Sequence, residues 1–102
     1  MGSWIRVAAL DECPPGTAIE RVAQERMIAL FNVDGTFYAL DGICPHQGGP
    51  LGQGSLSGPI VTCPWHGWQF DVRTGQNQLS SRLVQPCYEV RVEGSSILVN
   101  LE

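Results

Sequence analysis

The chain has 102 residues, of which 43% are hydrophobic and 16% charged, and its formal net charge is −4. This length leaves room for one hydrophobic core, so we expect a single domain over residues 1–102. The six basic residues are all Arg and are scattered along the sequence, which argues against a nucleic-acid-binding stripe. No apolar run is long enough to cross a bilayer and no secretory leader opens the sequence, so we expect a cytoplasmic protein without membrane contact.

Short segments rich in β-branched and aromatic residues, separated by turn signals, predict an all-β fold of antiparallel sheets. Asp34-Gly35 predicts a hairpin between two of these segments, and the run Glu93–Ser96 predicts another near the C-terminus. No stretch sustains a helical period, apart from a helical turn within 10–16. The predicted strands are 4–10, 17–23, 26–33, 36–41, 58–63, 68–72 and the two arms of 88–101.

Two segments rich in Gly and Pro, 44–58 and 63–67, do not fit strands and are predicted to be loops. The first begins Cys-Pro-His and the second reads Cys-Pro-Trp-His-Gly, so the pattern is C-x-H, sixteen residues, then C-x-x-H. The chain has only two His, and each stands beside a Cys. We therefore predict that Cys44, His46, Cys63 and His66 hold one metal centre.

The spacing of these ligands bears on the choice of metal. A structural zinc ion accepts two Cys and two His, but the single residue between Cys44 and His46 makes joint ligation of one ion awkward. The difficulty eases if each loop serves both atoms of a larger centre, as two irons bridged by two sulfides allow. A structural zinc domain stays as the distant alternative.

The two loops resemble the Rieske iron–sulfur signature, and the likeness extends from about Phe31 to Gly75. The resemblance implies one [2Fe–2S] cluster per chain, at the tip of antiparallel sheets, in a cluster-binding part of about residues 43–70. The implied ligands are Cys44 and Cys63 on the inner iron and His46 and His66 on the outer iron.

Some positions depart from the respiratory-chain members of that family. Those members have an additional Cys in each ligand loop, joined by a disulfide, where this chain has Gly49 and Trp65. They also place Ser and Tyr hydroxyls against the cluster sulfurs, where this chain has Trp68 and Phe70. Without these hydroxyls the reduced cluster is less stabilised, so we expect a potential near about −150 mV.

The resemblance implies an electron carrier, and not a catalyst on its own. Both His are used by the cluster, so none is left for the mononuclear iron of an oxygenase, and no nucleotide-binding fingerprint is present. We expect the chain to accept an electron from a flavoprotein reductase and to donate it to the terminal oxygenase of an aromatic-ring-hydroxylating system. The alternative is the small Rieske subunit of an assimilatory nitrite reductase, bound to its large subunit.

The remaining Cys, Trp and Gly residues have less specific predictions. Cys13 and Cys87 are expected to be buried free thiols, with the alternative that they are adjacent. Trp65 is predicted either to shield the cluster or to face a partner. For Trp68, packing in the core and docking of a partner are both open, and Phe70 is expected in the core. The loop glycines, which let the backbone adopt positive φ and approach the cluster closely, are Gly48, Gly49 and Gly67.

Overall fold

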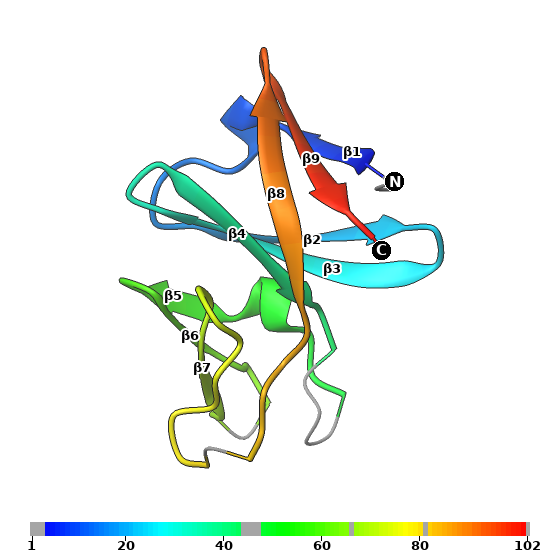
Figure 1. The fold of residues 1–102 in the computed structure, drawn as a ribbon. Helices are drawn as coiled ribbons and strands as arrows, with labels where there is room; N and C mark the ends of the chain where they lie inside the picture. Colours follow the sequence, from blue (N-terminus) through cyan, green and yellow to red (C-terminus); the bar gives the residue numbers. More distant parts are fainter. Residues whose placement is uncertain (1–3, 44–47, 66, 81, 102) are drawn as a thin grey trace.

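The computed structural model describes residues 4–43, 48–65, 67–80 and 82–101, and the all-β prediction is confirmed (Figure 1). A six-stranded antiparallel sheet has the order β1-β9-β8-β4-β3-β2, and a three-stranded one has the order β5-β6-β7. The large sheet contains β1 (Trp4–Ala9), β2 (Ala18–Ala23), β3 (Arg26–Val33), β4 (Thr36–Asp41), β8 (Cys87–Glu93) and β9 (Ser96–Asn100). The small sheet contains β5 (Ser55–Ser57), β6 (Ile60–Thr62) and β7 (Gln69–Asp71). Two 3₁₀ turns, η1 (Leu10–Glu12) and η2 (Leu51–Gln53), complete the elements.

The hairpins of the large sheet form where turn residues tolerate a left-handed backbone. Asp34 and Gly35 have φ of 51° and 93° and join β3 to β4, as predicted. The C-terminal hairpin between β8 and β9 is also confirmed. The turn between β2 and β3 uses Gln24 and Glu25, at φ of 51° and 66°, although neither residue is a favoured left-handed type.

The small sheet lies within residues 42–86, a segment between β4 and β8 that we call the small unit. The predicted hairpin of 58–63 with 68–72 is confirmed by the pairing of β6 with β7. Strand β5 lies inside the segment that was predicted to be a loop, so that part of the prediction was wrong. Only Leu56 of β5 packs against the core, which leaves too short an apolar pattern to identify the strand from sequence.

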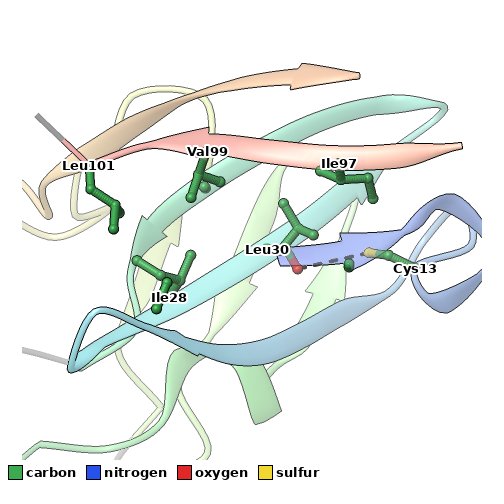
Figure 2. Packing of buried hydrophobic residues seen from close by; sticks show 9 residues of the cluster. Cys13, Ile28, Leu30, Ile97, Val99 and Leu101 are labelled. Atoms are coloured by element: carbon green, nitrogen blue, oxygen red, sulfur yellow. Dashed lines mark hydrogen bonds between the residues drawn. The ribbon is translucent and has the colours of Figure 1, made fainter. Parts of the chain in front are cut away.

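Strand β3 is the element on which both hydrophobic cores are built. Its alternate side chains Ile28 and Leu30 contribute to one core, with Ile97 and Val99 of β9 (Figure 2). Its intervening side chains contribute to a second core that includes residues of the small unit. The members of this second core are Ala29, Phe31, Leu40, Leu51, Val61, Cys63, Phe70 and Val72. The period-two geometry of a strand therefore ties the small unit to the large sheet.

The two Cys outside the motif differ in burial. Cys13 is fully buried, and its Sγ donates to the Leu30 carbonyl oxygen at 4.0 Å (Figure 2). Cys87 is exposed, so the prediction that both thiols are buried was wrong for this residue. It begins β8, in which Cys87, Glu89 and Arg91 alternate on the exposed side. Both thiols are free. Among the residues that the structure describes, no helix is long and apolar enough to cross a membrane.

Candidate metal centre

The two predicted ligand loops are in the small unit, and they begin at strands of different sheets. The first follows β4 and returns to η2, and the second connects β6 to β7. The described segments that flank them lie together at the end of the molecule opposite the β8–β9 hairpin (Figure 1). Cys63 is the one predicted ligand within the described ranges, whereas Cys44, His46 and His66 lie outside them. Accordingly, the described residues alone contain no cluster of three potential metal-binding side chains.

Backbone hydrogen bonds close the base of each loop. At the first loop, Ile43 and Pro50 form an antiparallel bridge, and the amide of Leu51 donates to the carbonyl of Gly42 at 2.9 Å. At the second loop, the amide of Cys63 donates to the carbonyl of Trp68 at 2.7 Å. Each loop therefore leaves and rejoins the scaffold at a fixed point.

Gly49 brings the two loops into contact. A Cβ built on Gly49 would lie 2.6 Å from Sγ of Cys63 and 3.1 Å from Cβ of Trp65, so only a glycine fits there. Its φ is not positive, and its role is to provide space. Gly48 and Gly67 do have positive φ, at 75° and 72°. Gly49 and Trp65, the positions where the resemblance places the two additional Cys of respiratory-chain members, thus lie against each other.

The residues that are present fit a mixed sulfur and nitrogen centre. Cys63 is 2% exposed and belongs to the second core, so its sulfur is on the inner side of the site. Its backbone is fixed by the bond to Trp68, and its sulfur lies against the backbone of Gly49. A thiolate on the protein side suits the inner iron of a Rieske cluster, whose other iron takes two imidazoles.

The aromatic residues after Cys63 divide between surface and core. Trp65 is 50% exposed, so part of its ring is accessible, and both of its predicted roles, shielding the cluster and facing a partner, stay predictions. Trp68 packs partly buried against the second core, and Phe70 is fully buried, as predicted. The second ligand loop therefore has one aromatic side chain available to a partner and two that anchor its return to the scaffold.

The charged residues near the site are few. Asp71 accepts hydrogen bonds from Nε and Nη2 of Arg73 at 3.0 and 2.7 Å. The Arg73 side chain, through these bonds, holds the pKa of the Asp71 carboxyl below its usual range. Arg82 is exposed, and its side chain makes no hydrogen bond or ion pair with the residues that the structure describes.

Sequence reasoning did not single out the last third of the small unit, where buried amides organise the chain. Asn77 and Gln85 are buried, and each bonds to backbone groups of other residues. Oδ1 of Asn77 accepts from the amides of Leu79 and Ser80. The sequence feature that could have pointed to Gln85 is the neighbouring Pro86. Proline has no N–H, so where it interrupts a strand pair the carbonyl opposite needs a donor from another group.

Comparison with known proteins identifies the family. The sequence model of the Rieske [2Fe-2S] domain matches residues 3–92. The ferredoxin component of the naphthalene 1,2-dioxygenase system of Pseudomonas aeruginosa is 34% identical over 100 residues, which cover 96% of this chain and 95% of that protein. The biphenyl dioxygenase ferredoxin subunit of Pseudomonas sp. (strain KKS102) is 35% identical over 104 residues, which cover 96% and 92%.

Solved structures agree with this assignment. A ferredoxin in the complex of reduced oxygenase and oxidized ferredoxin of carbazole 1,9a-dioxygenase has a TM-score of 0.87 and 31% identity, over 97% of this chain and 94% of that one. A protein described as an NADH-dependent nitrite reductase small subunit from Mycobacterium tuberculosis has a TM-score of 0.90 at 24% identity, over 100% and 97%. The second likeness shows the fold alone. The chain belongs to the Rieske [2Fe–2S] domain family, and a [2Fe–2S] cluster is its cofactor.

Proposed function

We propose that this chain is the ferredoxin component of a multicomponent oxygenase system. It carries one electron at a time from a flavoprotein reductase to a terminal oxygenase of the aromatic-ring-hydroxylating type. The observation that supports this most is the similarity to dioxygenase ferredoxins at 34 and 35% identity over 96% of the chain. The likeness to the nitrite reductase subunit lies at 24% identity and extends to the fold only.

We propose Cys44 and Cys63 as ligands of the inner iron and His46 and His66 as ligands of the outer iron. The buried Cys63 supports the inner placement of sulfur, and the fixed bases of both loops support a rigid site. When bound, the cluster supplies a one-electron redox centre whose potential is tuned by its ligands and hydrogen bonds. The chain has only these two His, so the proposal leaves none for a catalytic mononuclear iron, and the chain is not catalytic on its own.

The surface around the loops supports docking of the oxygenase at this end. Among the described residues, six large hydrophobic side chains are exposed, and four of them belong to the small unit: Ile43, Trp65, Leu79 and Val84. Leu79 is 90% exposed, and exposed apolar side chains that are grouped on one part of a surface are typical of an interaction site. The complex of a carbazole 1,9a-dioxygenase ferredoxin with its oxygenase shows that a relative forms such an assembly.

The distribution of charge indicates what kind of partner surface fits. The small unit contains three charged residues, Asp71, Arg73 and Arg82, and carries a net charge of +1. The rest of the chain contains nine acidic and four basic residues and carries a net charge of −5. A partner with an apolar recess and a negative rim would attract the small unit and repel the other end, so it would orient the protein correctly on approach.

Spectroscopy and reconstitution together test the proposal. The reduced protein should show an electron paramagnetic resonance signal of mixed thiolate and imidazole ligation, which His66→Ala should abolish and Cys13→Ser should leave intact. Electron delivery from a flavoprotein reductase to a terminal oxygenase of the aromatic-ring-hydroxylating type should require the chain. A colourless protein with one zinc ion per chain would contradict the cofactor. Turnover with a sirohaem nitrite reductase, and none with an oxygenase, would contradict the proposed partners.

We also propose that residues 1–102 act as one unit, because strand β3 contributes to both cores. We propose the cytoplasm as its location, since Cys13 and Cys87 form no disulfide. Fractionation of the native host into cytoplasmic and periplasmic extracts would test the location directly.

A further inference from the structure

Pro86 interrupts the strand pairing next to the first ligand loop. Strands β4 and β8 are paired with Leu40 opposite Cys87, and the pairing continues where the amide of Asp41 donates to the carbonyl of Pro86 at 2.9 Å. In an antiparallel pair of this kind, the opposite residue returns a second hydrogen bond from its own amide. Proline has no N–H, so the carbonyl of Asp41 receives no backbone donor from Pro86.

The side chain of Gln85 replaces the missing donor. Its Nε2 donates to the carbonyl of Asp41 at 2.7 Å and to the carbonyl of Ile43 at 2.6 Å. Both contacts are to oxygen atoms that only accept hydrogen bonds, so both amide hydrogens of Gln85 are used. The residue is 2% exposed, and water does not compete for these bonds.

The backbone of Gln85 is itself fixed. Its amide donates to the carbonyl of Gly75 at 2.7 Å. Gly75 has φ of 81°, and a Cβ at that position would overlap the carbonyl oxygen of Gln85. The turn that ends at Gly75 therefore holds Gln85 from one side while the Gln85 side chain holds the end of β4 from the other.

We propose that Gln85 is a positioning residue for the cluster, which acts by holding the Ile43 carbonyl, the last described group before the first ligand loop. This inference depends on the proposed role of Cys44 as a ligand. A peptide unit is rigid and planar, so a carbonyl held at 2.6 Å sets the direction in which the chain continues into the ligand loop. Groups that orient metal ligands in this way affect how tightly a metal centre is held and how it is tuned.

The test compares Gln85→Met, which keeps the length of the side chain and removes both donors, with Asn32→Leu. Asn32 is a matched control because it is 4% exposed and its amide also bonds to backbone groups, donating to the Cys13 carbonyl at 2.8 Å. It belongs to β3 in the large sheet and bonds to residues outside the small unit. Both variants lose buried hydrogen bonds, so a purely structural role would affect both proteins alike.

The readouts are the rate of iron release to a chelator and the signal of the reduced cluster in electron paramagnetic resonance. We expect Gln85→Met to release iron at least about tenfold faster than wild type and to change the g values, because two buried carbonyls lose their donor. Asn32→Leu should stay within about twofold of wild type with unchanged g values, since its lost bonds do not reach a ligand loop. Equal release rates and unchanged g values in the two variants would overturn the proposal.

A second variant tests the hydrogen-bond mechanism. Pro86→Ala restores a backbone N–H opposite Asp41, so the double variant Gln85→Met with Pro86→Ala should recover part of the lost iron retention. The carbonyl of Ile43 stays unpaired in the double variant, which should therefore still release iron faster than Pro86→Ala alone. This comparison remains decisive if Gln85→Met does not fold, and equal rates for the double variant and Pro86→Ala would refute the role of Gln85.

The ligand assignment is tested separately by Cys44→Ser. If this variant kept the wild-type signal, the ligand proposal would fail whatever Gln85 does. None of these measurements uses a reductase or an oxygenase, so they do not depend on the identity of the partners.

Discussion

The contact between the two ligand loops at Gly49 can be tested by adding one methyl group. Non-bonded heavy atoms pack best at about 3.5–4.0 Å. A Cβ on Gly49 would lie 2.6 Å from the sulfur of Cys63 and 3.0 Å from Cγ of Trp65, so Gly49→Ala requires one loop to move by about 1 Å. Overpacking of this size costs about 1–3 kcal/mol, and each kcal/mol lowers the melting temperature of a domain of this size by about 4–8 °C.

Gly52→Ala is the matched control for this substitution. Its Cβ would lie 2.8 Å from Cα of Glu20 and 2.8 Å from the carbonyl oxygen of Ile19, an overlap of similar size. Neither glycine has positive φ, so backbone strain does not distinguish the two variants. Both should lose a comparable amount of thermal stability, but the added methyl group of Gly49→Ala presses directly on the sulfur of a proposed ligand, whereas that of Gly52→Ala presses on β2.

The assay is the iron content of the purified variants and their rate of iron release, alongside thermal unfolding followed by circular dichroism. We expect Gly49→Ala to be purified with less iron and to release it faster than Gly52→Ala at equal loss of melting temperature. If Gly49→Ala bound and released iron as Gly52→Ala does, the sulfur of Cys63 would not be held where the cluster needs it, and the argument from loop contact would fail.

Three further predictions concern acid stability, thiol reactivity and potential. The pKa of Asp71 is lowered by Arg73, so this pair stabilises the fold above the unfolded-state pKa of about 4 and loses that effect as the pH falls below it. Asp71→Asn should therefore flatten the acid limb of the urea stability curve, and an acid limb identical to that of the wild-type protein would refute this. With iodoacetamide and mass mapping, native protein should be alkylated at Cys87 and not at Cys13, although burial raises the pKa of both thiols and slows the reaction. A redox titration should place the midpoint near about −150 mV, and a value above zero would contradict the argument from missing hydroxyl groups.

Much of the large sheet could be predicted because its turns and strands follow local rules. The Asp34-Gly35 hairpin formed as expected, since both residues tolerate the left-handed backbone that the turn requires. The turn at Gln24 and Glu25 carries no such signal and is imposed by the pairing of its flanking strands. The exposure of Cys87 was mispredicted, because a Cys is usually buried and only the register of β8 shows that this one is on the outer side.

The candidate site shows the same division between local and long-range information. The ligand pattern can be recognised in the sequence because a metal needs particular side chains at short spacing, and the assignment of the four ligands stays a prediction. The role of Gln85 could not be predicted from the sequence, because it depends on the pairing of β4 with β8. Gln85 and Ile43, which this pairing brings together, are more than forty residues apart in the sequence. Sequence therefore identified the proposed ligands, and structure was needed to find the amide that holds the chain next to them.

The sharing of β3 by both cores has a consequence for protein engineering. A metal-binding module that could be moved between scaffolds would need to bury its own apolar residues, but Val61, Phe70 and Val72 are buried against Ala29 and Phe31 of a strand outside it. An excised segment of residues 42–86 would expose that face to water and should not fold as an autonomous peptide. Transplantation of this redox centre into another β protein would have to include a recipient strand that is apolar on both faces.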